Sequence, residues 1–277
     1  MEGTDVRYKH SSSKTQFLLF FLLIFLLFSV GPLLSPYNSV EIALTNRLQT
    51  PSLEHPFGTD QLGRDILVRI LEGGKYTVGG SLIAIVLVLM IGVPIGMLSG
   101  YFGGRLDAIF MRFADSILAF PEFILAVVFA GLLGPSLFNV LIAIILVKWV
   151  TYARFVRGLV MMERKKEYII AAKISGATHF KIMTQHLLPS VIPSVIVLAT
   201  LDIGKIILFV SSLSYLGLGA QPPLPEWGLM LNEGKMFFLS HPHLMIFPGL
   251  AITITCLIFN ILGERLRDQL DVMQEKE

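Results

Sequence analysis

The sequence predicts an all-α membrane protein with six transmembrane helices. Of its 277 residues, 54% are hydrophobic and only 15% are charged, and the mean hydropathy is +0.72. Soluble domains have about 25% charged residues, so this composition is typical of a chain whose surface largely faces lipid. A bilayer core about 30 Å thick is crossed by about 20 mostly apolar helical residues, and no stretch alternates as a strand would. The expected spans are residues 17–34, 78–98, 106–133, 137–153, 191–216 and 244–262.

The first expected span follows three basic residues and could be a secretory signal, because its uninterrupted apolar core is short. Gly31 and Pro32 follow that core, and there is no cleavage pattern of two small residues separated by one. We therefore interpret the span as an uncleaved anchor. Together with a following outer segment, the anchor forms a predicted region of residues 1–75, ahead of a five-helix core over residues 76–277.

The second and third expected spans differ in polarity. The second carries four glycines, which let helices approach closely in lipid, where packing drives association. The third contains charged residues in its first half, among them Arg112 and Asp115, which are three residues apart and can pair on one helix face. Pro121 precedes Glu122. Since proline removes an internal hydrogen bond, it is expected to kink the helix or to start the helix proper.

The distribution of lysine and arginine predicts the orientation. With the N-terminus inside, fifteen of the 22 basic residues fall on the inner side, five fall on the outer side, and Lys148 and Lys205 lie within spans. Cytoplasmic loops of membrane proteins carry the excess of basic residues. A multi-pass protein of the cytoplasmic membrane is therefore expected, with both termini and the basic segment 163–189 in the cytoplasm.

The basic segment 163–189 is too polar to cross lipid, yet it is rich in helix-forming residues. We expect a short helix, a break at Gly176, where a residue with a β-carbon would resist a sharp turn, and a second amphipathic helix ended by Pro189. Ala171 and Ala172 leave room for a partner surface to come close. The alternative is an amphipathic helix on the lipid surface, which does not require alanine, glycine and proline at these offsets.

The spacing Glu-x3-Ala-Ala-x3-Gly-x5-Ile-x5-Leu-Pro in this segment resembles the EAA loop of bacterial ABC importer permeases, which docks into a groove on the ATPase. The glutamate stands four residues before the first alanine, a departure that is usual in the peptide and nickel branch of the family. The resemblance implies the type I importer permease fold and a role in coupling to the ATPase for seven residues. These are Glu167, Ala171, Ala172, Gly176, Ala177, His186 and Pro189.

Two further motifs resemble the second permease type of dipeptide, oligopeptide and nickel systems. Residues 58–65 read Gly-Thr-Asp-x-x-Gly-Arg-Asp, and residues 214–228 match the outer loop between the last two spans of those subunits. The resemblance implies that a substrate-binding protein delivers cargo to this outer loop. The candidate residues there are Gly217, Gly219 and Trp227.

The resemblance also implies the partners of the chain. A second, homologous permease subunit would complete the translocation path in the lipid, two ABC ATPase subunits would bind on the cytoplasmic side, and an extracytoplasmic substrate-binding protein would bind on the outer side. The sequence has no Gly-x4-Gly-Lys-Ser/Thr loop to cradle phosphate, so ATP and magnesium are expected on the ATPases and no cofactor on this chain. The net charge of +2 gives no reason to expect nucleic acid.

Two other classes of membrane protein compete with the importer as interpretations of this sequence. A channel or secondary transporter that works without ATP does not need the docking-loop spacing. A membrane enzyme needs a nucleophile paired with a base, and the sequence displays no such pattern. We therefore expect a transport subunit without catalytic residues.

The cargo is predicted to be nickel or a nickel chelate, with di- or oligopeptides as the alternative. Residues 148–154, Lys-Trp-Val-Thr-Tyr-Ala-Arg, resemble the same segment of nickel permeases, and residues 198–204 include an acid within a span, which is unusual for a plain peptide channel helix. Peptide permeases share part of the first segment, so both cargoes stay open.

Asp202 is the most informative charge, because an ionised carboxylate in mid-span costs about 2.5–3.5 kcal/mol on insertion scales and needs a partner or a wet cavity. Lys205 lies one helical turn along, and Lys148 is available from the fourth span. Two interpretations stay open: an internal ion pair that fixes helix packing, or a pathway acid that attracts or repels cargo. Because Lys205 can neutralise Asp202, this acid is not assigned as a metal ligand.

Six histidines invite a metal interpretation. His241 and His243 flank Pro242 at the expected outer mouth of the sixth span and could share a metal, but proteins usually add a third ligand. We expect both histidines to lie in solvent, with a metal relay as the alternative. The single cysteine, Cys256, lies in an apolar run and is expected to pack as a small hydrophobe.

Overall fold

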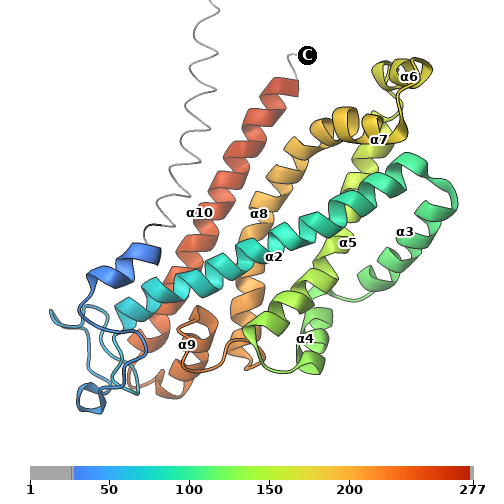
Figure 1. The fold of residues 1–277 in the computed structure, drawn as a ribbon. Helices are drawn as coiled ribbons and strands as arrows, with labels where there is room; N and C mark the ends of the chain where they lie inside the picture. Colours follow the sequence, from blue (N-terminus) through green and yellow to red (C-terminus); the bar gives the residue numbers. More distant parts are fainter. Residues whose placement is uncertain (1–25, 27, 275–277) are drawn as a thin grey trace, which may run out of the picture. The chain divides into compact units, whose positions relative to one another are not determined.

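The computed structural model describes residue 26 and residues 28–274 and is built from helices (Figure 1). The extended pairing in this part of the chain is an isolated bridge between Thr59 and Asp65, so the all-α prediction is confirmed. Short 3-10 segments are Gly31–Leu34, Leu44–Asn46 and Lys235–Phe237. The α-helices are α2 (Ile66–Phe102), α3 (Gly104–Leu118), α4 (Glu122–Leu133), α5 (Leu137–Glu163), α6 (Glu167–Ile174), α7 (His179–Ile182), α8 (Leu188–Tyr215), α9 (Trp227–Gly234) and α10 (His243–Gln274).

Two compact units make up the chain. The first unit contains the residues up to Thr77 together with Pro222–Gly249, and the second contains Val78–Gln221 together with the residues from Leu250 onward. The first unit therefore includes α9, and the second includes α3 to α8, while α2 and α10 contribute residues to both. The predicted division at residue 75 stays a prediction.

Four helical segments are long and apolar enough to cross a membrane: α2, α5, the run His179–Tyr215, and α10 as far as Gln269. They contain the second, fourth and sixth expected spans and all but the last residue of the fifth, which confirms those predictions. Each segment is longer than the apolar stretch predicted for it, because helical hydrogen bonding continues into polar sequence that hydropathy alone leaves out. Most of the first expected span lies outside the described residues.

The third expected span is broken. α3 and α4 meet at a bend of 88°, so they form a fifth span only if the bent pair crosses as one. Pro121 is the N-cap of α4, which confirms the prediction that it starts the helix proper, because proline cannot donate the bond that would continue α3. The predicted pairing of Asp115 with Arg112 is wrong. Asp115 pairs with Arg154, since α3 packs against α5.

The helix after the basic segment does not end at Pro189 as predicted. α7 continues through a π-helical stretch, Met183–Leu187, into α8, and Pro189 lies in the first turn of α8. Because the helix runs on from His179 to Tyr215, Pro189 removes one backbone donor from its interior, and the π-helical stretch ends two residues before it. The wider π turn shifts the hydrogen-bond register, so the chain continues from the loop into a span without a break.

Glycines of α2 bring its backbone against α5 within the second unit. A β-carbon on Gly92 would lie 2.7 Å from the carbonyl oxygen of Trp149, and one on Gly96 would lie 2.4 Å from the carbonyl oxygen of Ala153. Only glycine fits at such distances, and small residues four apart are the usual means of close helix packing in lipid. The predicted role of the small residues is thus confirmed for this pair.

Candidate functional site

The loop between α5 and α8 folds as α6, a tight turn and α7 (Figure 1). Gly176 has a φ of +80°. Its N–H donates to the carbonyl of Lys173 at 3.1 Å, and the N–H of Ala177 donates to the carbonyl of Ala172 at 3.0 Å. These two bonds form a Schellman motif, which closes a helix with a left-handed residue and favours glycine there. The hydroxyl of Thr178 then caps α7.

This loop has a buried side and an exposed side. Ile169, Ile182 and Leu187 are fully buried, so they hold the loop on the body of the second unit. The exposed side carries four large apolar side chains, which we call the loop patch: Tyr168, Ile170, Ile174 and Phe180. Of these, Ile174 is 82% exposed and Phe180 is 73% exposed. A group of exposed apolar side chains is typical of a surface that another protein covers.

The seven predicted coupling residues lie along this loop. Four of them are exposed: Glu167, Ala171, Gly176 and Pro189. Three are half-buried: Ala172, Ala177 and His186. Glu167 is the first residue of α6, where the helix dipole favours a negative charge. Their role in coupling stays a prediction.

Polar contacts fix the base of the loop to the end of α2. The hydroxyl of Tyr101 and Nδ1 of His179 are 2.8 Å apart. Nη1 of Arg164 donates to the carbonyls of Gly100 and Tyr101, each at 2.9 Å. Sequence alone does not predict these contacts, because partners 63 or 78 residues apart leave no local pattern.

A side-chain contact also joins α5 to α6. The hydroxyl of Tyr168 donates a hydrogen bond to Glu163, which is the last residue of α5. Partial burial, together with this hydrogen bond, raises the pKa of Tyr168 to about 12. Tyr168 is therefore a neutral donor at physiological pH.

Charged side chains gather around Asp202 within the spans of the second unit. Asp202 is 3% exposed and Lys148 is 2% exposed. Nζ of Lys205 lies 3.0 Å from Oδ1 of Asp202, and Nζ of Lys148 lies 3.6 Å from Oδ2. Lys148 also lies 3.1 Å from Oε1 of Glu122, and the hydroxyl of Tyr152 donates to Oδ2 of Asp202 at 3.0 Å. We call these five residues the Asp202 cluster.

The structure brings together the three predicted pathway candidates, Asp202, Lys205 and Lys148. It adds Glu122 and Tyr152, which sequence reasoning missed because they come from α4 and α5 and no spacing relates them to α8. The contacts that the ion-pair interpretation requires are thus present, because two acids face two ammonium groups. The pathway interpretation stays a prediction.

The three predicted outer-loop residues fall in different units. Gly217, with a φ of +86°, and Gly219 belong to the second unit. A β-carbon on Gly219 would lie 2.0 Å from Oγ of Ser214, so only glycine fits there. Trp227 belongs to the first unit, where it is buried and its indole N–H donates to the carbonyl of Ile70 at 2.9 Å. Trp227 is therefore an anchor of that unit's own packing.

The Gly-Thr-Asp motif forms part of a buried ionic network in the first unit. Oδ2 of Asp60 lies 2.6 Å from Nε of Arg64 and 3.5 Å from Nε of Arg69. Both arginines also reach Oε2 of Glu233, at 3.0 Å and 2.9 Å respectively. We call these four residues the arginine network. Because two carboxylates face two guanidinium groups, burial of the arginines is compensated by charge.

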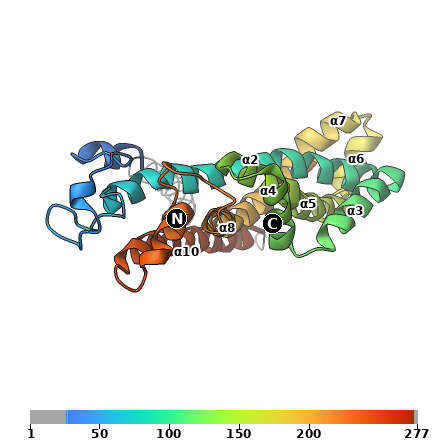
Figure 2. The same ribbon diagram turned by 90° about the horizontal axis from the view of Figure 1, so that it is seen from below.

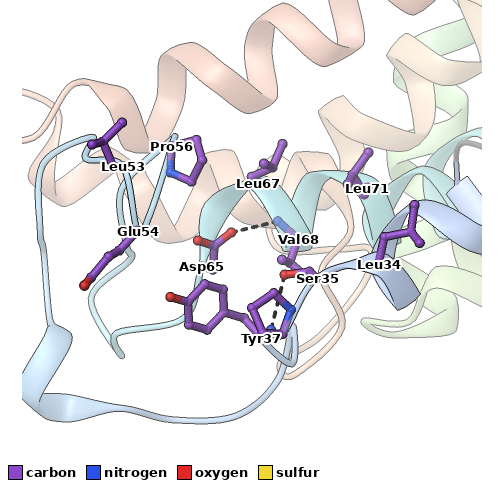
Figure 3. A pocket seen from close by; sticks show the side chains of 12 residues that line it. Leu34, Ser35, Tyr37, Leu53, Glu54, Pro56, Asp65, Leu67, Val68 and Leu71 are labelled. Atoms are coloured by element: carbon purple, nitrogen blue, oxygen red, sulfur yellow. Dashed lines mark hydrogen bonds between the residues drawn. The ribbon is translucent and has the colours of Figure 1, made fainter.

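The first unit also contains a hollow of about 490 Å³ (Figure 3). Much of its wall is apolar, including Leu34 and Leu67. Asp65 also lines the hollow, but its carboxylate accepts the backbone N–H of Val68 at 2.9 Å and lies 2.8 Å from Nδ1 of His55. Asp65 therefore caps the N-terminus of α2 with one carboxylate oxygen and contacts the His55 ring with the other.

The residues that the structure describes include no group of three or more histidine, cysteine, aspartate or glutamate side chains placed to hold a metal ion. The rings of His241 and His243 have centroids 5.9 Å apart. The expectation that both lie in solvent is wrong for His243, which is buried next to Gly58.

Cys256 is buried and its thiol donates to the carbonyl of Gly204 at 3.4 Å.

Residues 92–272, which include the α6–α7 loop and the Asp202 cluster, match the family described as "Binding-protein-dependent transport system inner membrane component". This chain belongs to that family. The permease therefore carries both features within the part of the chain that the family shares, and the resemblance predicted from the loop spacing is confirmed.

Relatives resemble the permease over most of its length. It is 44% identical over 236 residues to the nickel transport system permease protein NikC of Escherichia coli strain K12, covering 85% of each chain. It is 43% identical over 241 residues to the dipeptide transport system permease protein DppC of Alkalihalophilus pseudofirmus, covering 87% of the permease and 79% of DppC. It is 41% identical over 250 residues to the probable D,D-dipeptide permease DdpC of Escherichia coli strain K12, covering 90% and 84%.

The fold of the permease resembles a chain of the MetNI methionine ABC transporter solved in inward-facing conformations. The TM-score is 0.56 at 18% identity, over 73% of the permease and 97% of the solved chain. This likeness concerns the fold alone. With the family match, it confirms the predicted class: the permease is a multi-pass membrane subunit of an ABC importer with the type I fold.

Proposed function

We propose that the permease translocates nickel, as the ion or as a small chelate, across the cytoplasmic membrane as part of an ATP-driven importer. The observation that carries the cargo is the 44% identity to NikC over 85% of both chains. Import of di- or oligopeptides is the second candidate, favoured by the 43% identity to DppC.

The α6–α7 loop is the proposed lever between this chain and two partner ATPases. Its exposed apolar patch supplies a docking surface, and its buried isoleucines and leucine supply a rigid base. The contacts of Tyr101 and Arg164 at the same base tie the loop to α2, so a push on α6 would reach the spans. ATP and magnesium belong to the ATPases in this proposal, and this chain holds no cofactor.

The remaining parts of the importer complete the proposed path. A second, homologous permease subunit would close the path beside α8, with Asp202, Lys205 and Lys148 facing or flanking it. A substrate-binding protein would deliver cargo near Gly217 and Gly219, on the side opposite the loop. Both termini would lie in the cytoplasm, as the excess of basic residues on that side supports.

Uptake measurements in cells that lack this chain test the cargo. Radioactive nickel at low external concentration and a labelled dipeptide are supplied separately, with and without the restored permease. Loss and rescue of nickel uptake alone supports the proposal. Loss and rescue of dipeptide uptake alone favours the second candidate, and unchanged uptake of both overturns both proposed cargoes.

Gly176→Pro in the same strain tests the lever. Proline fixes φ near −65° and has no N–H, so it cannot adopt the φ of +80° or donate to Lys173. We expect ATP-dependent uptake to be lost while the protein still reaches the membrane in normal amount. Gly176→Ala should weaken the turn by about 1 kcal/mol and give partial uptake. Gly158→Ala is the control, since a β-carbon there meets nothing within 4 Å. Normal uptake by Gly176→Pro contradicts the lever.

A further inference from the structure

The ammonium group of Lys148 lies between two carboxylates that belong to different helices. It is 3.1 Å from Glu122 of α4 and 3.6 Å from Asp202 of α8, while Lys148 itself is on α5. These three helices pack together in the second unit, and the turned view shows α4 beside α8 and α5 (Figure 2). One side chain therefore joins all three helices.

The two ends of this bridge are held very differently. Asp202 is almost wholly buried and also receives Tyr152 and Lys205, so its position is fixed by three partners. Glu122 has 32% of its side chain exposed, and Oε1 makes no hydrogen bond besides its ion pair with Lys148. The contact of Lys148 with Glu122 is the shorter of the two, but Glu122 has fewer partners than Asp202 and a side chain that is partly exposed.

Glu122 also stands at the point where the backbone changes direction. It is the first residue of α4, directly after Pro121 and the 88° bend between α3 and α4. Next to it, the ring of Phe123 packs edge-on against Phe209 of α8, with centroids 5.4 Å apart. A rotation of α4 about its own axis, which the break before α4 leaves possible, would swing the side chains of Glu122 and Phe123 away from α8 together.

We propose that Lys148 and Glu122 form an ionic latch, which holds α4 against α5 and α8 in this conformation and opens at Glu122 in each transport cycle. The latch rests on the proposed function, since it needs a cycle driven by partner ATPases. It assigns Glu122 a positioning role that neither the family match nor the loop provides.

The charges explain why this contact can open and close. When Glu122 leaves, Lys148 keeps Asp202, so the buried ammonium is not left unpaired, which would be strongly unfavourable. The released Glu122 is partly exposed and can be hydrated. Lysine suits the task because its ammonium is a point charge on a flexible stem that can serve either partner. A contact that separates without stranding a buried charge is reversible.

Glu122→Gln in the complete importer, reconstituted in lipid nanodiscs with its ATPases, tests the latch. Without the latch, the conformation that follows opening is populated before cargo arrives. We expect ATP hydrolysis in the absence of the binding protein to rise about two- to tenfold, and stimulation by the loaded binding protein to shrink by a similar factor. Glu122→Asp, which keeps the charge, should restore part of the wild-type behaviour.

Asp115→Asn is the matched control, because it removes an exposed ion pair between α3 and α5 on the other side of the bend. It should leave both rates at the wild-type level. Wild-type rates in Glu122→Gln, in a complex whose wild type is stimulated normally, overturn the latch alone. A wild-type complex that the loaded binding protein does not stimulate overturns the proposed function, and the latch falls with it.

A tether between α4 and α8 gives a second, independent measurement. Cysteines replace Phe123 and Phe209 in a Cys256→Ser background, which removes the single native thiol and keeps a donor toward Gly204. A short bifunctional maleimide that joins the two cysteines should stop uptake into proteoliposomes, while either single cysteine treated in the same way should transport. Full transport after complete cross-linking overturns the latch.

Discussion

The arginine network of the first unit and the Asp202 cluster of the second both compensate charged side chains by ion pairing, but they differ in how far their members are buried. Each places two acids against two bases, so each is neutral as a whole. In the arginine network, both guanidinium groups are almost wholly buried and contact the same two carboxylates. In the Asp202 cluster, the outlying members are open, with Lys205 65% and Glu122 32% exposed at their side chains.

The difference lies in the chemistry of the bases. Arginine presents a rigid planar fork that fits carboxylates with fixed geometry, whereas lysine carries a compact charge on a flexible stem. A network of buried arginines that contact the same two carboxylates is suited to keep one set of ion pairs. A cluster of lysines with partly hydrated ends is suited to change partners. We therefore regard the first as a scaffold and the second as a moving part, and the following variants test that contrast.

Arg64→Ala should have the largest effect. It leaves two buried carboxylates with one guanidinium, and removal of one partner from a buried ion pair costs about 3–5 kcal/mol. Thermal unfolding of the purified permease should show a markedly lower midpoint than wild type. Arg47→Ala is the control, because Arg47 is exposed. A midpoint for Arg64→Ala equal to that of the control would show that the network is not a scaffold.

Asp202→Asn should have a smaller effect on stability. Lys148 keeps Glu122 as its partner and Tyr152 keeps a hydrogen-bond acceptor, so we expect a loss of about 1–3 kcal/mol. The same unfolding measurement checks this value. A loss as large as that of Arg64→Ala would mean that the Asp202 cluster is as closed as the arginine network.

Lys148→Arg places a guanidinium group, as in the arginine network, in the Asp202 cluster. A guanidinium that binds Glu122 and Asp202 at once should hold α4 more firmly, so we expect uptake to slow by about two- to tenfold with no loss of stability. Uptake assays and unfolding midpoints on the same preparations separate the two effects. Faster uptake with unchanged stability would contradict the idea that lysine is required for opening.

Lys205→Gln should have the smallest effect. Its ammonium group pairs with Asp202 but its side chain is largely exposed, and such pairs contribute about 0–1 kcal/mol. The unfolding midpoint should therefore stay near that of wild type. A large loss would show that this pair is shielded from water within the permease itself.

Local pattern predicts much of this molecule. Apolar length predicts four spans, the left-handed turn at Gly176 follows from its spacing, and the pairing of Asp202 with Lys205 follows from one helical turn. Each of these depends on neighbours in sequence. They needed no knowledge of how the helices pack.

The features that sequence did not predict depend on packing between helices. Glu122 and Tyr152 reach Asp202 only because α4, α5 and α8 meet. Asp115 pairs with Arg154 of a neighbouring helix and not with Arg112 of its own helix. The π-helical stretch before Pro189 is likewise invisible to hydropathy, since a change of hydrogen-bond register leaves the apolar pattern intact.

Gly92 and Gly96 let the main chain of α2 approach the main chain of α5 with no side chain of α2 at the contact. Side chains between two helices can change rotamer when the helices are displaced. Two main chains in direct contact have no such freedom. The two helices should therefore behave mechanically as one beam. A displacement applied at the far end of α5, where α6 begins, would then travel down the pair almost undiminished.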